Sequence, residues 1–68
     1  MTYDCKHSLK AQELDPTVSI SRGINWDWAN FKTEEAADDF YQYMSHNYGG
    51  QVRFTYLEFS NVYEVRWG

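Results

Sequence analysis

The sequence predicts an α+β domain: a small, antiparallel-rich sheet in the order strand–helix–strand–strand, with one helix packed on its aromatic face. Three patterns predict it. Apolar and polar residues alternate from Val18 onward, apolar residues recur every three or four positions after Thr33, and alternation returns from Gln51 onward. Sixty-eight residues are enough for one domain, which we expect to span 1–68.

Aromatic side chains are expected to stabilise so short a chain. Three Trp, six Tyr and four Phe are present, and each buries about 150–250 Å² when packed. Cys5 is the single cysteine, so no intrachain disulfide can form. Cys5, His7 and His46 lack the spacing of a zinc site. We therefore expect no metal and no cofactor, and aromatic packing supplemented by dimerisation.

The first elements are marked by breaks in polarity. Residues 1–16 are polar and end at Pro16, which predicts an N-terminal arm or a short helix over Ser8–Leu14 with Ser8 as N-cap. Alternation then predicts a strand whose core-facing residues share one parity. At Arg22-Gly23, either a bulge interrupts this strand or a turn divides it into two. The predicted core-facing residues are Val18, Ile20, Ile24, Trp26 and Trp28.

A helix is predicted from Thr33, a good N-cap residue followed by two acids that suit the helix dipole. Gly49-Gly50 ends it. Its apolar stripe consists of Ala37, Phe40, Tyr41, Met44 and Tyr48.

Two strands, Gln51–Phe59 and Val62–Trp67, follow. A tight turn at Ser60-Asn61 would pair Phe59 with Val62, although Ser-Asn is weak turn chemistry and a longer loop stays open. Parity then separates two faces. One carries Val52, Phe54, Tyr56, Tyr63, Val65 and Trp67, and the other carries Arg53, Thr55, Leu57, Phe59, Val62, Glu64 and Arg66.

Two surfaces are candidates for binding a partner. The first is an acidic helix face, because no Lys or Arg lies between Thr33 and Tyr48 to offset its carboxylates; a solvated face is the alternative. It consists of Glu35, Asp38, Asp39 and Gln42, and Glu34 and Asp27 could extend it. The second is the apolar tip of the last hairpin, formed by Leu57, Phe59 and Val62. Leu9 and Leu14, a second copy of the chain or a target protein could cover it.

Composition also excludes several functions. The net charge of −4 argues against direct nucleic-acid or membrane binding. No signal-peptide pattern or apolar run of ~18 residues is present, and a lone cysteine fits a reducing compartment, so we expect the cytoplasm. No catalytic or phosphate-binding motif appears. An enzyme is not expected, since a pocket of roughly 300 Å³ is hard to enclose in so small a core.

In outline, this acidic, aromatic-rich chain, with its Thr33-Glu34-Glu35-Ala36 helix start and terminal hairpin, resembles small phage-encoded inhibitors, including anti-CRISPR proteins and inhibitors of host RNA polymerase. The resemblance implies a stoichiometric binder in the host cytoplasm whose carboxylates occupy a site meant for nucleic-acid phosphates. We therefore expect a non-catalytic inhibitor that docks an acidic surface on a nucleic-acid-handling protein complex. The alternative is a self-assembling structural or small-ligand-binding module, such as a homodimer.

Overall fold

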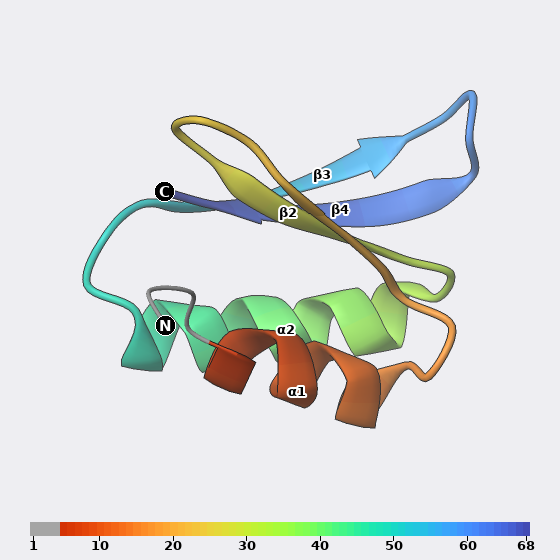
Figure 1. The fold of residues 1–68 in the computed structure, drawn as a ribbon. Coiled ribbons are helices and arrows are strands. Elements are labelled where there is room, and N and C mark those ends of the chain that lie inside the picture. Colours follow the sequence, from red (N-terminus) through yellow and green to blue (C-terminus); the bar gives the residue numbers. More distant parts are fainter. Residues whose placement is uncertain (1–4) are drawn as a thin grey trace.

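The computed structural model describes residues 5–68 as two helices packed on one face of a four-stranded antiparallel sheet (Figure 1). The elements are α1 (Cys5–Leu14), β1 (Ser19–Arg22), β2 (Asp27–Phe31), α2 (Glu34–Asn47), β3 (Val52–Leu57) and β4 (Val62–Trp67). The α+β class is therefore confirmed. Of the alternatives that the sequence left open, the structure shows a helix and not an irregular arm before Pro16, and two strands, β1 and β2, in place of one interrupted strand.

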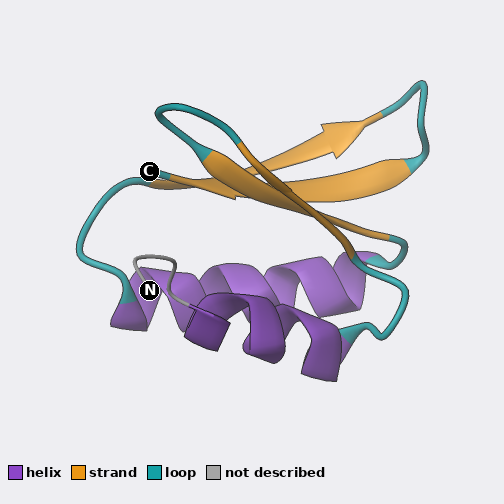
Figure 2. Cartoon of the chain, in the orientation of Figure 1, coloured by secondary structure: helices purple, strands orange, loops and turns teal. Residues whose placement is uncertain are grey.

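The sheet has the strand order β1-β2-β4-β3. Two hairpins, β1–β2 and β3–β4, are joined through α2, and β4 pairs antiparallel with both β2 and β3. The helices form one layer and the sheet the other, and no helix of residues 5–68 lies on the opposite face of the sheet (Figure 2). We refer to these as the covered face and the open face of the sheet.

The core lies between the covered face and the helices. Its largest fully buried side chains are Phe31, Phe40, Met44 and Val65. The ring of Phe40 lies 5.3 Å from that of Phe31 and 5.5 Å from that of Trp67, centroid to centroid. Such tilted and edge-on contacts are the favoured geometries for aromatic pairs. The expectation that aromatic packing stabilises the chain is borne out by these contacts.

The short N-terminal helix is confirmed, but it begins earlier than predicted. Because α1 starts at Cys5, Ser8 lies inside it and is not its N-cap. The spacing of the inward-facing residues fits the longer helix, since His7 and Ala11 are both buried one turn apart and Leu14 packs against the core. The predicted arm's residues 1–4 lie outside the described residues.

A turn, not a bulge, separates the first two strands. The Gly23 N–H donates to the Trp26 carbonyl at 2.7 Å, and β1 pairs with β2 on either side of this loop. Ile20 faces Ala29 and lies on the covered side as predicted, whereas Trp28 faces Ser21 on the open side. The core placement predicted for Trp28 is therefore wrong, because alternation is not carried through a turn.

The other residues of this loop also leave the predicted core. Ile24 is fully exposed, and Trp26 is half-buried with the Arg66 guanidinium 5.1 Å from its ring centroid. Both had been assigned to the core by the same parity that misplaced Trp28. A turn residue has no fixed face of the sheet, so parity within residues 23–26 has no structural meaning.

The last hairpin has a longer loop than the two-residue turn predicted. Leu57 pairs with Val62, so the predicted pairing of Phe59 with Val62 is wrong and the loop spans residues 58–61. Asn61 adopts a φ of 54°, a left-handed conformation that asparagine tolerates, and its side chain accepts a hydrogen bond from the Tyr56 hydroxyl at 2.9 Å. The register differs by two residues, an even number, so the predicted division of side chains between the two faces holds.

Candidate binding surfaces

The acidic face of α2 forms as the sequence predicts. Thr33 caps the helix, with its hydroxyl oxygen accepting from the Ala36 N–H at 3.3 Å. The helix buries Ala36, Ala37, Phe40 and Met44. That orientation leaves Glu34, Glu35, Asp38 and Asp39 exposed together on the opposite side. We call these four residues the acidic face.

The acidic face is not neutralised from within the described part of the chain. None of its four carboxylates takes part in an ion pair or side-chain hydrogen bond among residues 5–68. The positive end of the helix dipole favours Glu34 and Glu35 in the first turn. Asp38 and Asp39 lie beyond the first turn, three or four positions after one of the two glutamates. Like charges at i, i+3 and i, i+4 destabilise a helix by about 0.2–0.5 kcal/mol per pair. A basic partner would remove this repulsion.

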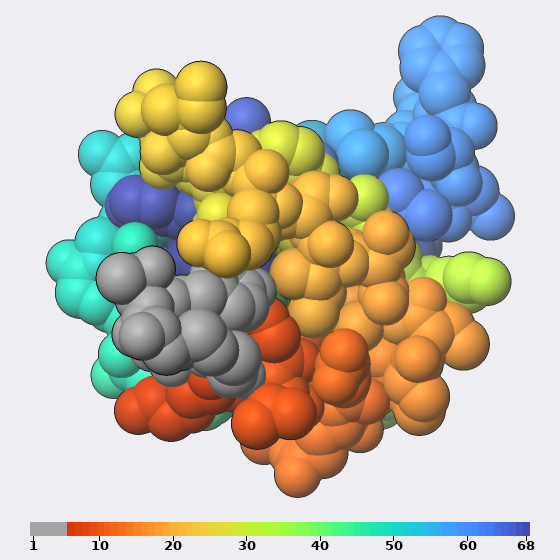
Figure 3. Space-filling model, viewed as in Figure 1, coloured from red at the N-terminus to blue at the C-terminus, as the bar shows by residue number. Residues whose placement is uncertain are grey.

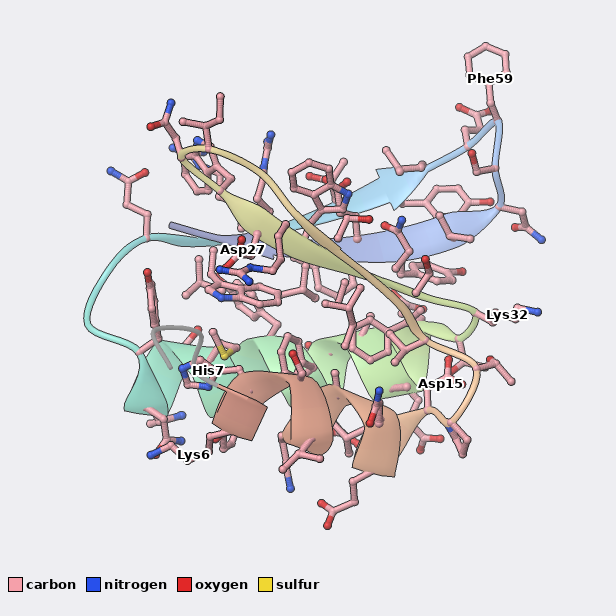
Figure 4. The ribbon with its side chains drawn as sticks, viewed as in Figure 1. Lys6, His7, Asp15, Asp27, Lys32 and Phe59 are labelled. Carbon is pink, nitrogen blue, oxygen red and sulfur yellow. The ribbon has the colours of Figure 1, made fainter. Side chains whose placement is uncertain are left out.

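Asp27 does not extend the acidic face. It is the first residue of β2, where it lies opposite Arg22 and Trp67, and it is half-buried. Asp27 and Tyr48 both line a cavity of about 240 Å³. Tyr48 is the C-cap of α2, so it lies at the opposite end of that helix from Glu34. Figure 4 shows Asp27 between the sheet and the helix layer. Asp27 and the acidic face therefore belong to opposite ends of the domain.

The hairpin tip divides into two parts. Leu57 and Val62 are half-buried partners on the open face, whereas Phe59 lies in the loop with a relative exposure of 107%. Its ring projects away from the body of the molecule (Figures 3 and 4). Helix α1, the described part of the N-terminal segment, does not cover the tip, because Leu14 packs against the core on the covered side and Leu9 is exposed. Among residues 5–68, nothing covers the ring of Phe59.

The acidic face and Phe59 lie at the same end of the domain. Phe31, the last residue of β2, pairs with Tyr63 beside the β3–β4 loop, and α2 begins shortly after Phe31. The loop also carries the exposed Glu58. Figure 1 shows the start of α2 and the β3–β4 loop at the same side of the view. We call the acidic face together with Glu58 and Phe59 the acidic end.

The open face carries a group that the sequence analysis did not assemble. Trp28 of β2 lies opposite Arg66 of β4, and Arg66 lies opposite Arg53 of β3. We call these three residues the Trp–Arg row. The two arginines could be assigned to one face from their parity, but Trp28 was assigned to the other face. Reading Gly23 as the start of a turn would have brought the three together.

Other kinds of site find little support in the described residues. No group of three or more metal-ligating side chains occurs among them, and no helix among them is long and apolar enough to cross a membrane. One carboxylate is strongly engaged: Asp15 accepts hydrogen bonds from the Thr17 hydroxyl at 2.7 Å, the Thr17 N–H at 2.9 Å and the Lys32 N–H at 3.2 Å. The Thr17 hydroxyl contributes most to lowering the pKa of Asp15, while partial burial opposes the shift. The bond from the Lys32 N–H joins the turn after α1 to the end of β2.

No protein-family model, curated protein or solved structure was found to match this chain.

Proposed function

We propose that this protein is a non-catalytic inhibitor that docks its acidic end on a basic surface of a protein complex that handles nucleic acid. Two observations together carry the proposal: Phe59 is fully exposed, and no cation of the described chain neutralises the four carboxylates of the acidic face. Small phage-encoded inhibitors such as anti-CRISPR proteins are the class it resembles. The carboxylates would take the place of phosphates on the partner.

The two parts of the acidic end have complementary roles in this proposal. Carboxylates accelerate encounter with a basic surface and select for it, whereas a buried aromatic holds the complex together. Phe59 makes no contribution to the core, and burying its side chain in a partner would contribute about 1.5–3 kcal/mol. Aromatic residues combined with polar groups are typical of protein-binding surfaces.

The test is affinity capture from a bacterial lysate with tagged protein, at low and at moderate salt, read by mass spectrometry. The variant Asp38→Asn with Asp39→Asn removes two charges from the acidic face, and Phe59→Ser removes the anchor. The control Gln12→Lys with Gln51→Lys changes the net charge equally at exposed positions elsewhere. We expect both test variants to lose a stoichiometric partner that the control retains. Equal capture by all three proteins would contradict the proposal.

Self-association through the open face is the alternative function, because the half-buried Leu57 and Val62 are apolar side chains on that face. Sedimentation separates the two. An oligomer at micromolar concentration that Leu57→Asp dissociates would favour a self-assembling module. A monomer in both cases would leave the inhibitor as the better explanation.

A further inference from the structure

We propose that the open face of the sheet binds single-stranded nucleic acid through the Trp–Arg row. This surface is on the opposite side of the sheet from the helices, so the inference does not depend on the acidic end or its partner. The expectation of no direct nucleic-acid contact came from the net charge of the whole chain. The structure separates that charge, with four acids on the helix layer and two arginines side by side on the open face.

The two adjacent arginines of the row favour the binding of an anion. Arg53 and Arg66 are direct cross-strand partners, and like charges placed opposite each other destabilise a sheet. Neither forms an ion pair with any carboxylate of residues 5–68, although ten acids are present in the sequence. Glu64 lies in the neighbouring row, opposite Thr55 and Asn30, and pairs with neither arginine. A phosphate between the two guanidinium groups would relieve this repulsion.

The same row offers planar groups on which bases can stack. The half-buried Trp28 lies against Gly23, where a Cβ atom would come within 2.9 Å of its Cζ3, so the glycine leaves room for the ring. The Arg66 guanidinium lies 5.1 Å from the Trp26 ring centroid. Bases of single strands stack on aromatic rings and on guanidinium planes. Stacking surface and positive charge therefore occur in one row.

The row fits a single strand better than a duplex or a second copy of the chain. A duplex keeps its base faces stacked on one another, so they cannot stack on Trp28. A second copy stacked face to face would bring the arginine pair of each chain into one interface, with only Glu64 from each to offset it. Two phosphate contacts give modest, salt-sensitive binding, with a slope of log K against log salt of about −1.4.

The experiment is a fluorescence-anisotropy titration of fluorescein-labelled dT12 and rU12 with the full chain at 50 and 200 mM salt. The test variant is Arg53→Gln with Arg66→Gln. The control, Lys10→Gln with Lys32→Gln, changes the net charge equally at positions away from the open face. We expect the arginine variant to lose the salt-dependent binding and the lysine control to stay within about twofold of the unmodified chain. Trp28→Leu is expected to weaken binding about tenfold by removing one stacking surface.

Three results would overturn this inference. They are no binding of either oligonucleotide at 50 mM salt, equal weakening by the arginine and lysine variants, and binding of a duplex as tightly as the single strand. Thermal melts of every variant show whether it folds, so lost binding is not mistaken for lost structure. Asp38→Asn with Asp39→Asn should still bind the oligonucleotides, which separates failure here from failure of the proposed protein docking.

Discussion

The covered and open faces of the sheet share the same strands but differ in chemistry. Along β4, Tyr63, Val65 and Trp67 face the helices, and the last two are buried. Val62, Glu64 and Arg66 alternate with them on the open face. One strand therefore supplies both a core and a polar, partly aromatic surface, as expected for an antiparallel sheet covered on one side.

This difference indicates which residues the fold requires. The covered face interlocks with α2 through aromatic contacts, so its side chains are constrained by packing. No helix of the described residues packs against the open face, and the placement of Arg53 opposite Arg66 on it lowers the stability of the sheet. Residues that the fold does not need, and even disfavours, are the better candidates for binding.

The largest expected change in stability comes from removing a core side chain that packs against the covered face. Phe40→Ala should destabilise the domain by about 3–5 kcal/mol, because it removes a fully buried ring and leaves a cavity. That loss rivals the whole stability of a domain with a total of about 5–15 kcal/mol. Urea unfolding followed by tryptophan fluorescence measures it. Phe59→Ala is the matched control, because this fully exposed ring should change the stability by no more than about 0.5 kcal/mol.

Comparable losses from the two Phe→Ala variants would break the distinction between constrained and unconstrained regions. Such a result would show that the β3–β4 loop contributes to the stability of the fold. Phe59 would then be a structural residue and not one that is free to bind a partner.

A smaller, pH-dependent effect is expected at Asp15, which links the turn after α1 to the end of β2. Its folded pKa is depressed, so its contribution to stability is present above the unfolded pKa of about 3.9 and is lost as pH falls through the folded value. Asp15→Asn should destabilise the domain at pH 7, and the difference should shrink below about pH 4. Thermal melts from pH 7 to pH 2 measure this. Asp38→Asn removes an exposed acid without such bonds among the described residues and is the control; the same pH dependence in both would contradict the assignment.

The sequence predicted the covered side well wherever one element supplied its own pattern. The α2 stripe correctly included Ala37, Phe40 and Met44, all buried. The division of β3 and β4 into two faces was also correct despite a wrong loop length, because an even shift preserves alternation.

Prediction from the sequence failed where the position of a residue depends on contacts beyond its own helix or strand. Ala29 and Phe31 are core residues of β2, but the pattern had assigned the opposite parity there because it was continued through the turn at Gly23. The location of Asp27 depends on α2 running back along β2, which no local pattern shows. The Trp–Arg row was missed for the same reason, since it joins three strands that only the sheet order β1-β2-β4-β3 brings together.

The smallest expected effect is a gain in stability on the open face. Arg53→Thr replaces one of two opposed arginines with a residue suited to strands, so the domain should become more stable by about 0.2–1 kcal/mol. Because the gain comes from charge repulsion, it should shrink as salt is raised from 50 to 500 mM, a range over which exposed charges become screened. Thermal melts at both salts measure it, with Thr55→Ser on the same strand and face as the control. A loss of stability at both salts would show that Arg53 supports the fold. The open face would then be constrained by folding like the covered face, and its residues would no longer be the better candidates for binding.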